Sequence, residues 1–240
     1  MSKVDNYIVL DTETGGLNTL LCPVTEVGFV VLDSDSLVEV SRYDEYVKVI
    51  DPVVTDDAGL KQLEKENNYP KTTYVGGYLS EEAIEKTGIK PETLSMKGID
   101  VKVVVDGCIN LFESAKTGSS RYSKPVIVGH NIGFDIGFMS YMFKSCRKDL
   151  SKYIAGNTDS SGNWYPNYID TITWVKCKDT SLNSYGLRGV AETMGVELSN
   201  AHRAITDVLA TAQVFRLMVN NMRSDTNTQQ TQRHRNRFQI

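Results

Sequence analysis

Long apolar runs are missing from this sequence, and their absence argues against a membrane protein. No uninterrupted apolar stretch approaches the roughly 18 residues that a membrane-spanning helix needs. The amino-terminal residues MSKVDNYIVLDTE reach acidic side chains almost at once, so they do not resemble a secretory signal peptide. We therefore expect a cytoplasmic protein that has no membrane partner.

Cysteine is scarce, with 4 residues in the chain, and no two of them form a close CxxC pair. No histidine lies beside them in a pattern typical of a zinc site. Phosphate-binding loops of the GxxxxGK[ST] type and dinucleotide-binding GxGxxG loops are also absent. The sequence predicts free, buried thiols in a reducing compartment at Cys22, Cys108, Cys146 and Cys177.

An excess of positive charge is likewise missing, because 26 basic and 30 acidic side chains give a formal net charge of −4. Bulk electrostatics therefore do not favour tight, sequence-independent binding to nucleic acid. A nuclease is not excluded, since divalent cations bound by its carboxylates would reverse the local sign of the charge. The hydrophobic share of 40% supplies enough apolar material for a substantial core.

The first fifty residues are rich in strand signals, and the later part alternates strands with helices. Residues 7–10 form a short apolar run that ends at Asp11, and residues 125–129 form a second one. This pattern predicts an α/β fold in which a mixed sheet has helices on both faces and sites at the carboxyl ends of strands. Further strands are predicted over residues 24–32, 37–43, 46–50 and 168–170, and helices from residue 80, within 98–113, and over 136–146, 171–176, 181–194 and 203–222.

One domain is predicted over residues 1–222, followed by a polar, disordered tail over residues 223–240. Residues 51–79 interrupt the strand pattern with charged, tyrosine-containing sequence that has no clear period. We interpret this segment as an insertion or a long surface loop. Alternatively, its aromatic and basic side chains would stack on and neutralise a single strand, through Tyr69, Tyr74, Tyr78 and nearby lysines.

Four carboxylates and one histidine are the candidate catalytic residues. Asp11 and Glu13 lie two residues apart at a strand end, so both side chains point to one face. Asp135 follows the second apolar run, and His202 lies just before the helix that carries Asp207. Taken one at a time, Asp11 and Glu13 would be a solvated acidic turn, Asp135 an acid at a helix start, and His202 a structural histidine. Together they supply oxygen ligands for Mg²⁺ or Mn²⁺ and a general base for phosphodiester hydrolysis.

Three segments resemble, in the same order, the three motifs of the DEDDh, or DnaQ-like, 3′–5′ exonucleases. They are residues 8–17 (IVLDTETGGL), 128–135 (VGHNIGFD) and 201–212 (AHRAITDVLATA). The five-residue spacing from His202 to Asp207 is typical of the DEDDh subgroup. Three motifs in order, with a complete Asp-Glu-Asp-His-Asp set, make a specific signal.

The resemblance implies a ribonuclease H-like fold with a five-stranded mixed sheet and two Mg²⁺ or Mn²⁺ ions as cofactors. It implies that Asp11, Glu13 and Asp207 hold the ion that carries the attacking water. Asp11 would also bind the second ion, and Asp135 would complete the metal site. His202 would take the proton from the nucleophile, and nucleoside 5′-monophosphates would leave from a single-stranded 3′ end.

The resemblance also implies which residues contact the terminal nucleotide. Asn131 and the backbone around Thr14 and Gly15 match positions that grip this nucleotide, and Leu17 matches an apolar residue that packs on its base. Gly15 is a departure, because the commoner Thr-Thr-Gly-Leu version of the motif has its second threonine there. The glycine removes one hydroxyl from the substrate site and predicts a looser turn.

We therefore expect a 3′–5′ exonuclease that proofreads or trims single-stranded DNA or RNA 3′ ends, with DNA somewhat favoured. A polymerase or another replication protein is a candidate partner, and the sequence carries no signal for an oligomeric state. One alternative is a catalytically silent nuclease-fold module that binds nucleic acid or assists a polymerase, although the complete acidic set argues against it. Another is an unrelated nucleotide-binding α/β protein, which the absence of a phosphate-binding loop disfavours.

Overall fold

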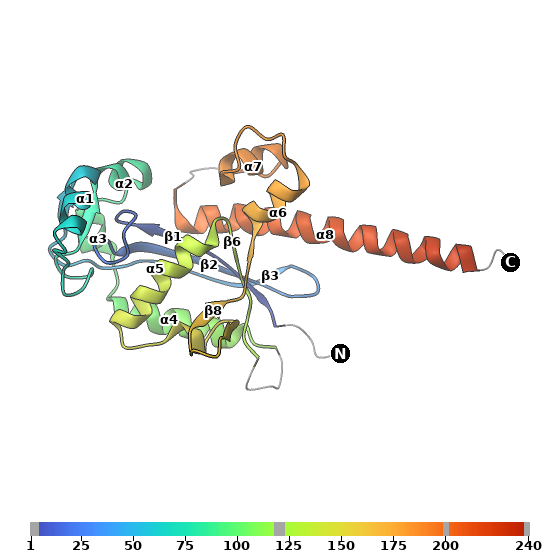
Figure 1. Cartoon of the computed structure of the whole chain (residues 1–240), viewed down its shortest axis with the longest axis horizontal. Helices are drawn as coiled ribbons and strands as arrows, with labels where there is room; N and C mark the ends of the chain where they lie inside the picture. Colours follow the sequence, from blue (N-terminus) through green and yellow to red (C-terminus); the bar gives the residue numbers. More distant parts are fainter. Residues whose placement is uncertain (1–4, 118–122, 199–201, 238–240) are drawn as a thin grey trace.

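A five-stranded mixed sheet lies at the centre of the molecule, as the sequence predicted (Figure 1). The computed structural model describes residues 5–117, 123–198 and 202–237, with side chains as far as residue 224. Strand β1 pairs antiparallel with β2, which pairs antiparallel with β3, whereas β1, β6 and β9 run parallel. In sheet order the strands are β3 (Glu39–Tyr46), β2 (Val24–Leu32), β1 (Tyr7–Thr14), β6 (Ile127–Gly129) and β9 (Tyr168–Asp170).

The other elements form the covering helices and two small two-stranded sheets. In chain order they are β4 (Val53–Thr55), α1 (Asp57–Lys65), β5 (Tyr78–Ser80), α2 (Glu81–Thr87), α3 (Pro91–Lys97), α4 (Val101–Ser114), α5 (Ile132–Ser145), a 3₁₀ turn (Leu150–Lys152), β7 (Gly156–Thr158), β8 (Trp164–Pro166), α6 (Thr171–Lys178), α7 (Leu187–Thr193) and α8 (Ala204–Arg237). Within the described residues, no helix combines the length and the apolar character needed to cross a membrane.

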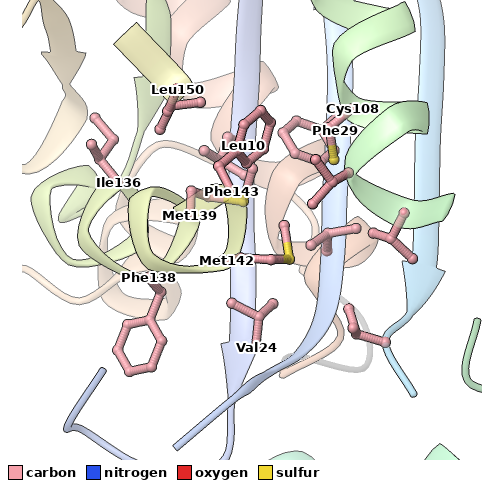
Figure 2. Close-up of a cluster of buried hydrophobic side chains, with 14 of the residues drawn as sticks. Leu10, Val24, Phe29, Cys108, Ile136, Phe138, Met139, Met142, Phe143 and Leu150 are labelled. Carbon is pink, nitrogen blue, oxygen red and sulfur yellow. The ribbon is translucent and has the colours of Figure 1, made fainter. Parts of the chain in front are cut away.

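Helices cover both faces of the sheet because alternate side chains of β1 pack on opposite sides. Leu10 faces α4 and α5, and Figure 2 shows it beside Met139 and Phe143 of α5. Val9 faces the other way and packs with Val208 and other residues of α8. The predicted three-layer arrangement of helices around a mixed sheet is therefore confirmed.

The segment 51–79 is a packed part of the fold, so it is not a long surface loop, and its interpretation as an insertion stays a prediction. It contains α1, β4 and most of β5, and the side chains of Leu60, Tyr74 and Leu79 are buried in the core. The hydroxyl of Tyr74 accepts a hydrogen bond from the backbone N–H of Val24 at 3.4 Å. Tyr74 is therefore not available to stack on a nucleic-acid base.

Helix α8 continues to Arg237, so it extends beyond the end predicted at residue 222 and through residues 223–237 of the predicted tail, and residues 238–240 lie outside the described part. A helix that is already nucleated by packing extends readily through residues such as Gln and Arg, which are good helix formers. Among the free cysteines, Cys22 and Cys108 are buried as expected, whereas Cys146 is partly buried and Cys177 is exposed.

Gly28 of β2 allows the start of α8 to lie directly on the sheet. A Cβ atom at this position would lie 2.6 Å from the backbone carbon of Ala204 and 2.8 Å from the backbone nitrogen of Ile205. Both neighbours are backbone atoms, so they can move only if the helix moves. The contact therefore fixes the height of α8 above the sheet.

We predict that Gly28→Ala destabilises the protein, because overpacking against backbone costs about 1–3 kcal/mol. The matched control is Gly137→Ala in α5, where a Cβ atom meets nothing within 4 Å. That substitution should instead stabilise the helix by up to about 1 kcal/mol. Urea unfolding of both variants checks the pair, and equal stabilities would contradict the proposed close contact at Gly28.

Candidate active site

The first two carboxylates lie inside β1, beyond the end of its neighbour β6. The strand runs to Thr14, so Asp11 and Glu13 are not at a strand end as the sequence suggested. Strand β6 pairs with β1 only at Ile8 and Val9, which leaves the later part of β1 paired with β2 alone. Asp11 and Glu13 share the α8 face with Val9, because side chains of a strand alternate.

The third motif brings His202 and Asp207 to the same place. The backbone N–H of His202 donates a hydrogen bond to Oδ2 of Asp207 at 3.1 Å. His202 lies just before α8, and Asp207 lies in its first turn. Candidate ligand atoms of Glu13, His202 and Asp207 all lie within 4.8 Å of one another. His202 has φ of +73°, a left-handed conformation that is uncommon for a side chain with a Cβ. The turn that enters α8 therefore holds the histidine over the acids.

Asp135 is held by Thr12, a residue that the sequence analysis did not single out. Oδ1 of Asp135 accepts hydrogen bonds from the backbone N–H of Thr12 at 2.9 Å and from its hydroxyl at 2.8 Å. Thr12 lies between Asp11 and Glu13 and points to the opposite face of the sheet, toward α5. The two hydrogen bonds thus join the first turn of α5 to the strand that carries the first two acids.

Glu26 is a second functional residue that the motifs did not indicate. It lies opposite Glu13 in the β1–β2 register and is 1% exposed. Its Oε1 accepts hydrogen bonds from Nε and Nη2 of Arg203 at 2.9 and 2.8 Å, and its Oε2 accepts one from the backbone N–H of Ala204 at 3.1 Å. Glu26 therefore caps α8 from the sheet. An acidic residue inside the apolar strand 24–32 was the available signal.

The polar residues around the second motif fasten β6 to the elements that follow it. The imidazole of His130 contacts the hydroxyl of Thr171 at 2.9 Å and the carbonyl of Tyr185 at 2.7 Å. The backbone N–H of Asn131 donates to Oδ1 of Asp170 at 3.0 Å. These contacts connect the end of β6 with α6 and with the segment leading into α7.

Burial raises the pKa of these acids, and the charges of neighbouring carboxylates add to the effect for Asp11 and Glu13. Burial first, and then the charges of Asp135, Glu13 and Asp207, raise the pKa of Asp11 well above its ordinary value. Burial, followed by the charges of Asp207 and Glu26, raises the pKa of Glu13 from 4.5 to about 8. Burial also raises the pKa of Asp135 to about 7, although the hydrogen bonds from Thr12 oppose the shift. Such a site favours the arrival of positive charge.

These residues fit a divalent metal site. Oδ1 of Asp207 is buried and has no hydrogen-bond partner among the described residues, so an acceptor aimed into the site is left for a ligand. Burial raises the pKa of Asp207, as it does for the other acids. Clustered carboxylate oxygens are the donors that Mg²⁺ or Mn²⁺ prefers, and the imidazole of His202 lies beside them.

All five candidate catalytic residues line one open cleft of about 750 Å³. Three of the four predicted substrate contacts, Thr14, Leu17 and Asn131, line it as well. Leu17 is 80% exposed at this cleft, so its apolar surface is available to a ligand.

Gly15, the fourth predicted contact, is buried behind the cleft lining, and its backbone is not loose. A Cβ atom there would lie 2.7 Å from both the carbonyl oxygen of Tyr78 and the Cδ2 atom of Leu79 in β5. Its backbone N–H donates to the carbonyl of Pro23 at 2.9 Å, and its carbonyl accepts from the N–H of Ser80 at 2.6 Å. The missing threonine side chain is therefore explained by close packing against β5.

Comparison with known proteins shows which family and which relatives this chain is similar to. The model of the family described as Exonuclease (RNase_T) matches residues 77–215, a range that contains Asp135, His202 and Asp207 but not β1. The chain is 26% identical over 217 residues to a PolC-type DNA polymerase III of Pediococcus pentosaceus, covering 90% of this chain and 12% of that protein. It is 24% identical over 217 residues to Ribonuclease T of Shewanella oneidensis, covering 89% of this chain and 81% of that protein.

A solved structure of E. coli Exonuclease I in complex with a dT13 oligonucleotide has the same fold. The TM-score is 0.63 at 20% sequence identity, and the match covers 89% of this chain and 40% of that one. The chain thus spans about an eighth of the PolC-type relatives and less than half of the Exonuclease I chain.

We predict that the metal-free protein loses stability as pH rises from about 5 to about 8. Glu13 has a raised pKa in the folded state, so its contribution to stability is complete below 4.5 and is lost as pH rises through about 8. Added Mg²⁺ or Mn²⁺ should restore stability at the upper end of this range. Thermal unfolding midpoints in EDTA and in Mg²⁺, across this range, test both statements.

A pair of variants separates the contribution of Glu13 from that of other titrating groups. Glu13→Gln should reduce the pH dependence in EDTA, with Asp11 and Asp135 supplying the remainder, whereas Glu85→Gln on the exposed side of α2 should leave it unchanged. A midpoint in EDTA that is as high at pH 8 as at pH 5 would rule out repulsion among these acids.

Proposed function

Because this chain belongs to the exonuclease family, we propose that it is a metal-dependent 3′–5′ exonuclease that releases nucleoside 5′-monophosphates from single-stranded 3′ ends. The observation that supports this proposal most directly is the convergence of five side chains on one cleft: Asp11, Glu13, Asp135, His202 and Asp207. They come from β1, α5 and the start of α8, which are distant in the chain.

We assign the metal ligands to the four carboxylates. Asp11, Glu13 and Asp207 would hold one Mg²⁺ or Mn²⁺ ion, Asp11 would also bind a second, and Asp135 would complete the site. Bound ions of this kind lower the pKa of a coordinated water and neutralise the charge that develops on the phosphate. The unpartnered Oδ1 of Asp207 and the raised pKa of Glu13 support this assignment.

His202 is the proposed general base, which accepts the proton of the attacking water. Burial, together with the positive charge of Lys86, lowers the pKa of His202 below 6.5, so its imidazole is neutral near pH 7. Its ring makes no hydrogen bond to any described residue, whereas its backbone is fixed by Asp207. The main chain thus holds the residue in place while the ring nitrogens remain available to a water.

A single-stranded DNA 3′ end is the substrate that we favour. The exposed Leu17, with Thr14 and Asn131 nearby in the cleft lining, would pack on and grip the terminal nucleotide. Exonuclease I, which shares the fold, has been solved with an oligothymidylate, and the PolC-type relatives suggest a polymerase or other replication partner. The similarity to a Ribonuclease T keeps RNA 3′ ends as the second candidate substrate. A catalytically silent module is disfavoured because it would keep the repulsion among the acids without using it.

We predict that Asp11→Asn and Asp207→Asn each reduce Mg²⁺-dependent release of mononucleotides to the level without enzyme. His202→Ala should slow turnover by about 10²–10⁴-fold, the usual contribution of a general base, while Mg²⁺ binding measured by calorimetry is largely retained. Glu85→Gln is the matched control, because this exposed residue of α2 does not line the cleft. Full activity in either aspartate variant would refute the assignment.

The polarity and sugar preference are tested with matched oligonucleotides. We expect 3′-labelled single-stranded DNA to release its label at once as a mononucleotide, and 5′-labelled DNA to shorten stepwise. Double-stranded ends should react more slowly, because the terminal base must reach the cleft unpaired. A parallel digest of RNA of the same sequence measures the sugar preference, and a faster RNA reaction would overturn the preference for DNA.

A further inference from the structure

Two cations at the cleft have no hydrogen-bond or ion-pair partner among the described residues, and neither has yet been assigned a contact with the substrate. Among the described residues that line the cleft, the basic side chains are Lys86 on α2 and Arg188 on α7. Both are exposed, and neither forms a hydrogen bond or an ion pair with a described residue. Glu82 and Glu192 line the same cleft, yet neither forms an ion pair with these cations in the described structure.

Each cation is carried by an element that is fastened to a different part of the acidic site. The hydroxyl of Ser80 caps α2 by accepting from the N–H of Ala83, and the backbone N–H of Ser80 donates to Gly15, just after β1. Helix α7 packs through Val190 and Ala191 against α8, which carries Asp207. In Figure 1, α2 lies with α1 and α3 at one end of the sheet, whereas α7 lies above α8. The two cations therefore belong to two different walls.

Both charges act on the catalytic residues. Lys86 lowers the pKa of Glu13, of Asp207 and of His202, and Arg188 lowers the pKa of Asp207 and of His202. Both side chains also line the same cleft as Asp11, Glu13 and Asp207. A strand whose 3′ end reaches the acids would thus pass within reach of both cations.

We propose that Lys86 and Arg188 form a phosphate clamp, which binds the backbone phosphates of a single strand from the two walls of the cleft. The inference rests on the proposed exonuclease function and deepens it. An ammonium acts as a point charge on phosphate, and a guanidinium donates two parallel hydrogen bonds to it. Such contacts carry no base preference, as an enzyme that degrades any sequence requires.

The clamp also predicts which ligand stays bound in the cleft after a nucleotide has been released. A strand with several phosphates can offer each cation a phosphate of its own, whereas a released mononucleotide has a single phosphate for both. The clamp therefore favours retention of the shortened strand over retention of the product.

The test is the salt dependence of binding by the whole chain. A labelled single-stranded oligothymidylate is titrated in Ca²⁺, used as a probe to occupy the metal site, at several NaCl concentrations. Lys86→Gln and Arg188→Gln should each weaken binding roughly fivefold at low salt, an estimate reduced for exposure. Each should also lower the slope of log affinity against log salt by about 0.7. Lys97→Gln on α3, exposed and outside the cleft lining, should change neither quantity.

A phosphate scan identifies which contact each cation makes. Each phosphate near the 3′ end is replaced in turn by a neutral methylphosphonate, and binding is compared between wild type and each variant. At the phosphate that Lys86 contacts, combining Lys86→Gln with the methylphosphonate should weaken binding less than the sum of the two separate effects. Arg188→Gln should show the same non-additivity at a different phosphate. Lys86→Arg and Arg188→Lys, which keep the charge, should retain the wild-type slope.

The outcomes separate the clamp from the exonuclease proposal. If both charge-removing variants keep the wild-type slope and affinity while mononucleotides are still released, the clamp is wrong and the exonuclease assignment stands. If only one variant changes the slope, the two-walled clamp is also wrong. If the slopes change as predicted but no mononucleotide is released, the clamp stands and the exonuclease assignment falls.

Discussion

The gathering of four carboxylates away from solvent, which raises their pKa values, is the constraint on which the rest of this structure depends. Asp11, Glu13 and Asp135 have raised pKa values chiefly through burial, with their neighbours' charges adding to the shift of the first two. The chain holds two of the four acids with neutral donors, namely the backbone and hydroxyl of Thr12 for Asp135 and the backbone of His202 for Asp207. Neutral donors fix a carboxylate in place without cancelling the negative charge that attracts a divalent cation.

The ion pair beside these acids is made by Glu26, which lies opposite Glu13 in the β1–β2 register. Arg203 binds Glu26, on the strand next to β1, instead of a catalytic carboxylate. The same glutamate caps the first turn of α8, while Gly28 lets the helix lie close to the sheet. The position of Asp207 therefore depends on two residues of β2, which itself contributes no candidate ligand. Because β6 is short, α5 on one face and α8 on the other both reach the free end of β1.

The acids could be found in the sequence because each lies in a local pattern with a fixed spacing. Asp11 and Glu13 follow an apolar run, and His202 precedes Asp207 by five residues. The mixed sheet with helices on both faces followed from the order of strand and helix signals together with the resemblance. Local patterns of this kind can be recognised in a sequence without knowledge of the tertiary contacts.

The supporting residues could not be found in that way, because their roles depend on register and on contacts between distant segments. Thr12 is important only because α5 brings Asp135 beside it, across 123 residues of chain. The segment 51–79 looked like a loop since its few apolar residues, among them Leu60 and Leu79, show no period, yet they reach the core. Helix α8 passed its predicted end because composition alone does not separate an exposed helix from a disordered tail.

The contact at Gly15 makes the turn after β1 and the strand β5 a matched pair. Family averages would recommend threonine at this position, yet its Cβ would push into the carbonyl of Tyr78 and the side chain of Leu79. A consensus-guided redesign would therefore have to exchange both segments together. The first motif of this protein therefore cannot be replaced alone, because a change in the turn after β1 constrains β5 and a change in β5 constrains the turn.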